Sequence, residues 1–209
     1  MEKEYKWLAS EAIRAQFCEM LAKHPFLRGS GILHMAADYY ETPDRTLREQ
    51  GVALRLRREN EKTVCCMKRT LQKTGALAVR EEYETETSDL REGLMKLPEA
   101  GAPKDICIFL AAQNLTAFAQ TAFTRQWFLL DAGAFTAEFA VDAGKLGNSD
   151  HMEPFEELEF ELKSGDPDAF CAYAERIQAE YALTPQPLSK LARAAAAGRT
   201  VSDSTSDTL

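Results

Sequence analysis

The stretch EKEYK at positions 2–6 decides how the rest of this chain is interpreted. Alternate residues of a β-strand share a face. Glu2, Glu4 and Lys6 would therefore line one surface of a strand, while Tyr5 and Trp7 lie on the other. One face is wholly charged and the other is largely aromatic, so the faces of every other predicted strand need the same comparison.

Length and composition favour a single domain. The chain has 209 residues, of which 45% are hydrophobic, enough for a sizeable core. We place the domain at residues 1–197 and expect the polar segment 198–209 to be a disordered tail. The 33 acidic and 25 basic residues give a formal net charge of −8. This charge gives no general attraction to nucleic acid or to an anionic membrane, so an anion site must be a local basic cluster.

The N-terminal residues and the cysteines favour a cytoplasmic protein. The chain is charged from residue 2 and lacks the apolar core of a signal peptide, and no segment approaches the ~18 apolar residues that span a bilayer. The five cysteines include no CxxC pair, and the adjacent Cys65 and Cys66 would point to opposite faces of a strand. We therefore expect neither thiolate ligation of a metal nor a disulfide framework.

Hydrophobic periodicity predicts strands punctuated by a few helices. Besides the first strand, the predicted strands cover residues 32–42, 52–60, 62–70, 77–86, 123–131, 135–146 and 155–165. The predicted helices cover residues 10–24, 88–97, 104–113, 165–183 and 188–198. Ser10 and Asp166 are the expected N-caps of two of these helices, and residues 42–51 read as a turn.

The division of faces in the first strand recurs along the chain. Arg55 and Arg57 share a face, with Leu54 and Leu56 opposite. The other same-face charged sets are Arg80, Glu82, Glu84 and Glu86; Glu138 and Asp142; and Glu157, Glu159, Glu161 and Lys163, with Lys68 and Arg125 as single basic positions. Charged residues thus recur at alternate positions on at least six predicted strands.

Two architectures explain such charged faces. In the first, they are the solvated face of an antiparallel sheet whose apolar face packs on helices. In the second, an eight-stranded antiparallel barrel turns its charged faces inward, where the interior is just wide enough for one small ligand. A solvated face would mix in more Thr, Ser and Gln. We therefore predict a mainly β fold with flanking helices (α+β), built as an eight-stranded antiparallel β-barrel, or tunnel, with a charged lumen.

A charged lumen implies particular ligands. Burying unpaired charges costs several kcal/mol each, so water, metal ions and a polyanion should occupy the space. Clustered acids without His or Cys suit a hard cation with oxygen ligands, either Mg²⁺ or Mn²⁺. Clustered Arg and Lys suit phosphate. Together these preferences indicate metal-assisted phosphoryl chemistry.

The same charged blocks resemble the CYTH superfamily, the triphosphate tunnel metalloenzymes. EKEYK matches the ExExK opening of that superfamily, and further blocks follow in its order: YYETPD, LRLRREN, CCMKRT, VREEYE, EFAVDAG, ELEFELKSGD and LSKLAR. The resemblance covers residues 1 to about 195 and is greatest to the bacterial inorganic triphosphatase branch. It implies a tunnel that hydrolyses tripolyphosphate to pyrophosphate and phosphate with Mg²⁺ or Mn²⁺.

The resemblance also implies a role for individual residues. Phosphate oxygens would be bound by Lys6, Arg55, Arg57, Lys68, Arg80 and Arg125, with Lys190 and Arg193 reaching in from the last helix. Asp142, Glu157 and Glu159 would hold the metal that bridges the phosphates. Glu2 and Glu4 would hold a second metal or orient the attacking water, and Lys6 would act beside them in catalysis.

Rival functions stay open at the level of the sequence. The same fold could hydrolyse thiamine triphosphate, cyclise ATP as a class IV adenylate cyclase, or bind polyphosphate without catalysis. Retention of all five candidate metal ligands favours catalysis. We find no aromatic residue on the charged faces of these blocks, and expect Tyr39 and Tyr40 to be packing residues. Tripolyphosphate is therefore preferred over ATP as the small-molecule partner. We expect no nucleic acid or membrane partner, and the oligomeric state is open.

Overall fold

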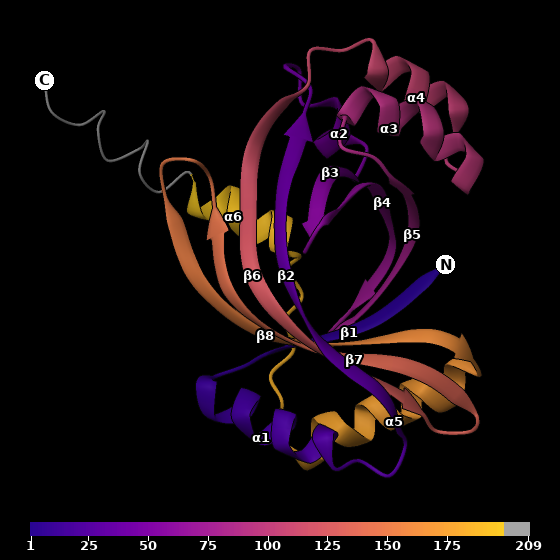
Figure 1. The fold of residues 1–209 in the computed structure, drawn as a ribbon, viewed down its shortest axis with the longest axis vertical. Helices are drawn as coiled ribbons and strands as arrows, with labels where there is room; N and C mark the ends of the chain where they lie inside the picture. The colour runs from indigo at the N-terminus through magenta and orange to yellow at the C-terminus, as the bar shows by residue number, and fades with distance from the viewer. Residues whose placement is uncertain (199–209) are drawn as a thin grey trace, which may run out of the picture.

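The computed structural model describes residues 1–198, which form a β-barrel with helices around and inside it (Figure 1). The strands are β1 (Glu2–Leu8), β2 (Leu27–Glu41), β3 (Val52–Glu59), β4 (Lys62–Thr74), β5 (Leu77–Glu86), β6 (Thr116–Asp131), β7 (Phe135–Gly147) and β8 (Met152–Gly165). The helices are α1 (Glu11–Ala22), α2 (Thr46–Glu49), α3 (Leu90–Lys96), the 3₁₀-helix η1 (Leu97–Ala100), α4 (Lys104–Ala111), α5 (Pro167–Glu180) and α6 (Lys190–Ala197). The tail predicted for 198–209 lies, except for Gly198, outside the described residues, and the domain limit at 197 stays a prediction.

The strands close into a barrel in the order β1-β5-β4-β3-β2-β6-β7-β8. The short strand β1 completes the ring by pairing with β5 on one side and β8 on the other. All of these pairs are antiparallel, and the long strands β2 and β6 pair from end to end. The predicted eight-stranded antiparallel barrel with flanking helices is therefore confirmed for the part of the chain that the structure describes.

The largest apolar cluster lies outside the barrel wall, beneath α1 and α5. Trp7, Phe139 and Phe160 come from β1, β7 and β8 and are fully buried there. Ring centroids of Trp7 and Phe139 lie 6.1 Å apart, and Phe160 stacks on Phe170 of α5 at 4.9 Å. Because side chains alternate along a strand, burying these rings under the helices directs the intervening charged residues inward. Figure 1 shows both helices together at one end of the molecule.

A second cluster covers the outer face of β3 and β4 under α3 and α4. Leu54 and Met67 pack there against Leu94 and Cys107 of the helix pair. This pair lies at the end of the molecule opposite α1 and α5 (Figure 1). Apolar residues thus cover the outside of the barrel at both ends, which confirms the inverted arrangement that the alternating faces predicted.

Helix α6 packs on the inner face of the barrel instead. Its buried residue Ala194 lies in a cluster with Ala119 of β6 and Phe155 of β8. Ala119 is an even number of residues from Arg125, and Phe155 is two residues from Glu157, so these side chains share the inward face. The helix therefore fills part of the interior beside β6 and limits the space left for a ligand.

Local capping signals explain two of the helix starts. The Ser10 hydroxyl accepts a hydrogen bond from the Ile13 amide at 3.4 Å, as predicted. The Asp166 carboxylate accepts hydrogen bonds from the amides of Asp168 at 2.9 Å and Ala169 at 3.4 Å. Each side chain satisfies amides that have no partner within the helix.

None of the helices within residues 1–198 combines the length and the apolar character that crossing a bilayer requires.

The segment 42–51, predicted as a turn, contains the one-turn helix α2. The buried Glu41 carboxylate accepts hydrogen bonds from the amides of Leu47 at 3.0 Å and Arg48 at 2.9 Å. A carboxylate at this position stabilises the first turn by meeting unpaired amides and the positive end of the helix dipole. An acidic residue does precede this helix in the sequence, but Glu41 lies too far before Thr46 to match the usual N-cap spacing.

Strand β6 begins at Thr116, whereas the sequence predicted a start at Phe123. The additional residues pair with the end of β2, where Ala119 lies opposite Tyr39 and Thr116 opposite Glu41. The segment contains few β-branched or charged residues, so its own propensity was weak. The partner strand supplies the missing hydrogen bonds.

We expect Asp166→Ala to lower the free energy of unfolding by about 1 kcal/mol, because the N-cap of α5 is lost. Urea denaturation followed by circular dichroism measures this change. Asp168→Ala, in the first turn of the same helix, removes a charge without removing the cap and should have a smaller effect of a few tenths of a kcal/mol. Equal destabilisation by the two variants would contradict a capping role for Asp166.

Candidate active site

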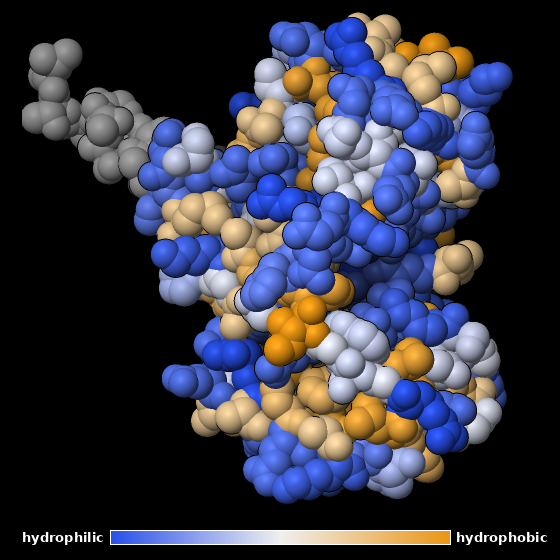
Figure 2. All heavy atoms as spheres, in the orientation of Figure 1, coloured by the Kyte–Doolittle hydropathy of each residue, from blue (hydrophilic) through white to orange (hydrophobic). Residues whose placement is uncertain are grey.

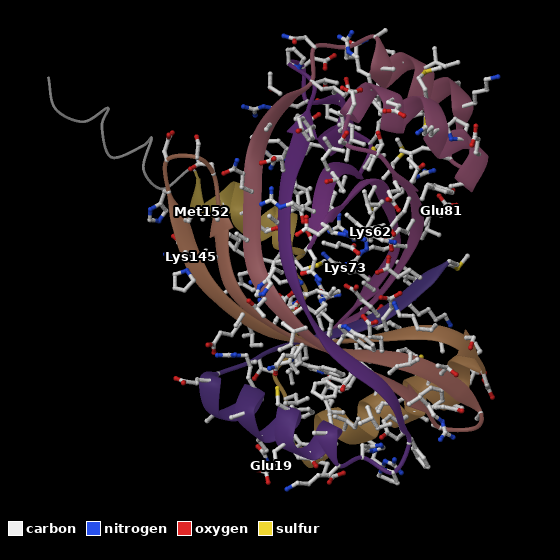
Figure 3. All side chains as sticks on the ribbon, in the orientation of Figure 1. Glu19, Lys62, Lys73, Glu81, Lys145 and Met152 are labelled. Atoms are coloured by element: carbon white, nitrogen blue, oxygen red, sulfur yellow. The ribbon has the colours of Figure 1, made fainter. Side chains whose placement is uncertain are left out.

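The barrel encloses a cavity of about 570 Å³, within the range of roughly 300–1,000 Å³ that small-molecule sites occupy. Side chains crowd the space inside the ribbon in Figure 3, whereas the labelled Glu19 lies on α1, outside the barrel. The predicted site residues that line this cavity are Glu2, Glu4, Lys6, Arg55, Arg57, Lys68, Arg80, Arg125, Glu159 and Lys190. The structure therefore brings most of the predicted set around one space.

Three acidic residues on neighbouring strands form a compact cluster at one side of the interior. Asp142 on β7 lies directly opposite Glu157 on β8, and Glu159 follows two residues later on the same face. One carboxylate oxygen of each lies within 4.8 Å of the others. Asp142 and Glu157 are fully buried. Three hard oxygen ligands at this spacing fit a divalent cation such as Mg²⁺ or Mn²⁺. We call these residues the acidic triad.

The acidic triad is surrounded by three cationic side chains. The Lys190 ammonium of α6 lies 2.8 Å from Asp142 and 2.9 Å from Glu159, and also contacts Glu157. The Arg125 guanidinium donates two hydrogen bonds to Asp142, at 2.8 and 2.7 Å, and a third to Glu159. Arg193, which does not line the cavity, pairs with Glu157 at 2.5 Å.

These contacts set the pKa values of the cluster. Burial by itself would raise the pKa of Glu159, but Lys190 and Arg125 outweigh it and hold that pKa well below the ordinary value. Burial raises the pKa of Glu157 despite the opposing charge of Lys190. Burial would lower the pKa of Lys190, yet the three carboxylates raise it. Glu159 and Lys190 are therefore both charged at neutral pH.

A second charged group lies where β1 passes β5. Arg80 donates to Glu4 at 2.6 Å and lies 3.6 Å from Glu2, while the Lys68 ammonium lies 3.2 Å from Glu2. Burial raises the pKa of Glu2 to about 9 against the attraction of Lys68, with Glu4 adding to the rise. Burial also raises the pKa of Glu4, but Arg80 and Lys6 help to bring it below the ordinary value. Glu4 is thus the ionised member of the pair at neutral pH.

Glu2 and Glu4 belong to neither of the groups of potential metal ligands found among residues 1–198. Their role in a second metal site stays a prediction. Lys6, next on the same face, is buried and donates to the Leu188 carbonyl at 3.1 Å while lying 3.7 Å from Glu4. The position of Lys6 between Glu4 and the segment before α6 links the two charged groups.

The remaining predicted arginines lie on β3 and pair with acids that the sequence left without a role. Arg57 lies 2.5 Å from Glu59 and 2.8 Å from Glu84, and Arg55 lies 3.7 Å from Glu82. Their inward orientation was predicted from alternation, and the inward side of Glu82 and Glu84 could be predicted in the same way. The specific pairs depend on the register between β3, β4 and β5, which the sequence does not encode locally.

Cys66 lies in a second potential ligand group with Glu82 and Glu84. Its thiol donates a hydrogen bond to Glu82 at 3.2 Å. Burial raises the pKa of the Cys66 thiol to about 12, partly offset by Arg55. The thiol is therefore protonated at neutral pH, and the expectation that thiolates do not ligate a metal stays a prediction.

The expectation that no aromatic residue lies on the charged faces is wrong. Tyr39 and Phe123 line the cavity with Leu33, Met35 and Leu191, so the wall formed by β2, β6 and α6 is largely apolar. The Lys190 ammonium lies 4.9 Å from the centroid of the Phe123 ring. Phe123 is two residues from Arg125 and shares its face, a signal that was missed because only charged positions were compared. Tyr39 and Tyr40 do pack in apolar clusters, as predicted, and both also line the cavity.

The three histidines take no part in this site. His24 contacts the Tyr173 hydroxyl at 3.1 Å, His34 contacts Thr124 at 3.5 Å, and His151 lies 3.3 Å from Glu153. All three lie outside the set of residues that line the cavity.

Figure 2 shows that hydrophilic residues dominate the visible face of the molecule, with smaller apolar areas between them.

Comparison with known proteins identifies relatives along nearly the whole chain. The profile of the CYTH domain matches residues 1–195. An inorganic triphosphatase from Haemophilus influenzae is 28% identical over 199 residues, which cover 92% of this chain and 53% of that protein. The chain therefore spans about half the length of this curated relative.

Solved structures show the same fold at low sequence identity. A protein from Hippeastrum, studied as an adenylyl cyclase and described as having a dominant triphosphatase activity, has a TM-score of 0.61 and 17% identity, covering 95% of this chain and 97% of that one. The Mimivirus capping enzyme triphosphatase has a TM-score of 0.53 and 11% identity, covering 86% and 88%. At these identities the likeness shows the architecture alone.

Proposed function

The chain belongs to the CYTH family, and from that premise we propose that it hydrolyses inorganic triphosphate to pyrophosphate and phosphate within its barrel. The observation that carries the proposal is that the acidic triad, whose Glu159 lines the cavity, adjoins a ring of inward arginines and lysines around the same cavity. Carboxylates alone would suit a cation, and basic residues alone would suit an anion. Both together suit a polyphosphate that enters with a divalent metal.

In this proposal Asp142, Glu157 and Glu159 hold Mg²⁺ or Mn²⁺, which fits their all-oxygen ligand set. When bound, the metal neutralises phosphate charge and polarises water. Glu2 and Glu4 hold a second metal or orient the attacking water. Glu4, as the ionised member of that pair, is the better acceptor for a proton from water.

The basic residues position the substrate in the proposed reaction. The cavity-lining residues bind phosphate oxygens: Lys6, Arg55, Arg57, Lys68, Arg80, Arg125 and Lys190. Arg193, which pairs with Glu157 behind the cavity lining, assists them from α6. Water attacks the terminal phosphorus, the bridging P–O bond breaks, and pyrophosphate leaves. Such a transfer requires mainly alignment and charge stabilisation, so no Ser or Cys nucleophile is needed.

An organic triphosphate is the second candidate substrate, and the apolar wall is the observation that favours it. Tyr39, Phe123 and Met35 offer a surface on which a nucleobase or thiazolium ring could pack. The Hippeastrum protein, studied as an adenylyl cyclase, shares the fold. Inorganic triphosphate remains our first proposal because every charged contact in the site addresses phosphate or metal.

We expect kcat/KM for tripolyphosphate to exceed the values for ATP and thiamine triphosphate by at least roughly tenfold, or about 1.4 kcal/mol. Tripolyphosphate carries more negative charge for the same three phosphorus atoms, so the basic ring should stabilise its transition state more. Phosphate release measured for each substrate with Mg²⁺ or Mn²⁺ tests this, and excess EDTA should abolish it. Ratios near one, or cyclic AMP formed from ATP, would instead support the second candidate.

A further inference from the structure

The ammonium of Lys190 lies at the centre of the acidic triad. It contacts Asp142 at 2.8 Å and Glu159 at 2.9 Å, and it also contacts Glu157. Lys190 itself is only 8% exposed. A single positive group therefore contacts all three carboxylates whose oxygens converge within 4.8 Å of one another.

The charges of this cluster are balanced without any metal. By formal charge, Asp142, Glu157 and Glu159 contribute three carboxylates, and the side chains paired directly with them, Lys190, Arg125 and Arg193, contribute three cations. Buried carboxylates require such partners, because unpaired buried charges are costly. A divalent cation added to this arrangement would leave an excess of positive charge. It would also contact the same carboxylate oxygens as the ammonium, and the two cations would repel each other at that distance.

We propose that Lys190 is an internal counter-ion which occupies the metal position of the acidic triad in the ligand-free protein, so that metal loading requires its ammonium to leave. This inference rests on the proposed function in one respect, the assignment of the triad as the metal site. It goes further by giving Lys190 a role before substrate arrives. It also explains how three converging carboxylates are held in a ligand-ready arrangement.

The surroundings of Lys190 suit such an exchange. Its ammonium lies 4.9 Å from the Phe123 ring centroid and 5.7 Å from that of Phe155, and aromatic faces attract a cation. Lys190 is the first residue of α6, directly after the N-cap Ser189. Its long side chain can therefore turn without displacing the rest of the helix. A polyphosphate in the cavity would offer the released ammonium a new partner, so metal and triphosphate should bind cooperatively.

Calorimetric titration with Mn²⁺ alone tests the exchange without an activity assay. Lys190→Met keeps the length of the side chain but removes its charge, and should bind Mn²⁺ at least about tenfold more tightly than wild type, a gain of about 1.4 kcal/mol. Lys163→Met is the matched control, because Lys163 lines the same cavity but pairs with Glu161 and Glu138. It should change Mn²⁺ affinity by less than about threefold, since Lys163 pairs with none of the three triad carboxylates.

Thermal unfolding supplies an independent measurement. If lysine and metal exchange, Lys190→Met should lower Tm in EDTA and lose most of that difference in saturating Mn²⁺. A purely structural lysine would lower Tm equally in both conditions. Should Lys190→Met fail to fold, NMR of isotope-labelled lysine in wild type gives the same answer: Mg²⁺ should shift the Lys190 side-chain resonance, assigned through Lys190→Arg, more than any other lysine resonance.

The exchange would be overturned if Lys190→Met bound Mn²⁺ with the affinity of wild type, or if no variant bound Mn²⁺ measurably. An unshifted Lys190 resonance on addition of Mg²⁺ would overturn it as well. The proposed function is judged separately, by metal-dependent phosphate release from tripolyphosphate in wild type. Activity without tighter binding in the variant would reject the exchange alone. Tighter binding without any hydrolysis would support the exchange and reject the proposed reaction.

Discussion

Replacement of Glu159 by glutamine is expected to lower kcat/KM for tripolyphosphate by at least about a thousandfold, or about 4 kcal/mol. Glu159 contacts both Lys190 and Arg125 and contributes one of the three converging oxygens of the acidic triad. Glutamine preserves the size of the side chain but removes its charge. The cluster then carries a positive excess and has one anionic ligand fewer, so it should hold a divalent cation poorly.

Steady-state phosphate release over a range of Mg²⁺ and Mn²⁺ concentrations measures this loss. Glu161→Gln is the matched control, because Glu161 is the next inward residue of β8 and lies outside the triad, where it pairs with Lys163 at 2.9 Å. We expect that control to retain activity within about tenfold of wild type. A Glu159→Gln enzyme as active as the control would remove the triad from the proposed metal site.

The architecture was predictable from the sequence because alternation carries most of its information. Each inward charged residue is flanked by apolar residues that must face the other way, as Glu157 and Glu159 are by Leu158. The same charged face recurs on successive strands, and only a sheet that closes into a barrel encloses all of these faces. The comparison of faces therefore fixed which side of each strand faces the lumen before any contact was known.

The pairs inside the lumen could not be predicted in the same way. Alternation gives the side of the sheet, whereas partners depend on the shear of the barrel and on where α6 enters. Lys190 was expected to reach in from the last helix and bind phosphate, and the sequence carried no indication that its ammonium would also contact three carboxylates. Phe123 was overlooked for a different reason: alternation puts it on the same face as Arg125, but only charged positions were compared.

Substrate binding and proton acceptance are expected to depend on different residues of the lumen, and paired substitutions can separate the two roles. We expect Arg57→Ala to weaken binding of a slowly hydrolysed triphosphate analogue and to lower kcat/KM by about a hundredfold, or about 2.7 kcal/mol. Arg57 lines the cavity between Glu59 and Glu84, so its removal takes away a phosphate partner and leaves two acids facing the polyanion. Arg58→Ala, the adjacent exposed arginine, should leave both quantities unchanged.

Glu4→Gln should behave in the opposite manner, with kcat lowered about a hundredfold and analogue affinity changed by less than about threefold. Glu4 is a buried, ionised carboxylate beside Arg80 and Lys6, and as an anion it contributes nothing favourable to phosphate binding. Its loss removes the group that we propose accepts the proton of the attacking water. Calorimetry of the metal-loaded variants gives the affinities, and steady-state kinetics gives kcat. Equal losses of affinity in Glu4→Gln and Arg57→Ala would show that both residues only bind substrate, because a proton acceptor must affect turnover more than the ground-state complex.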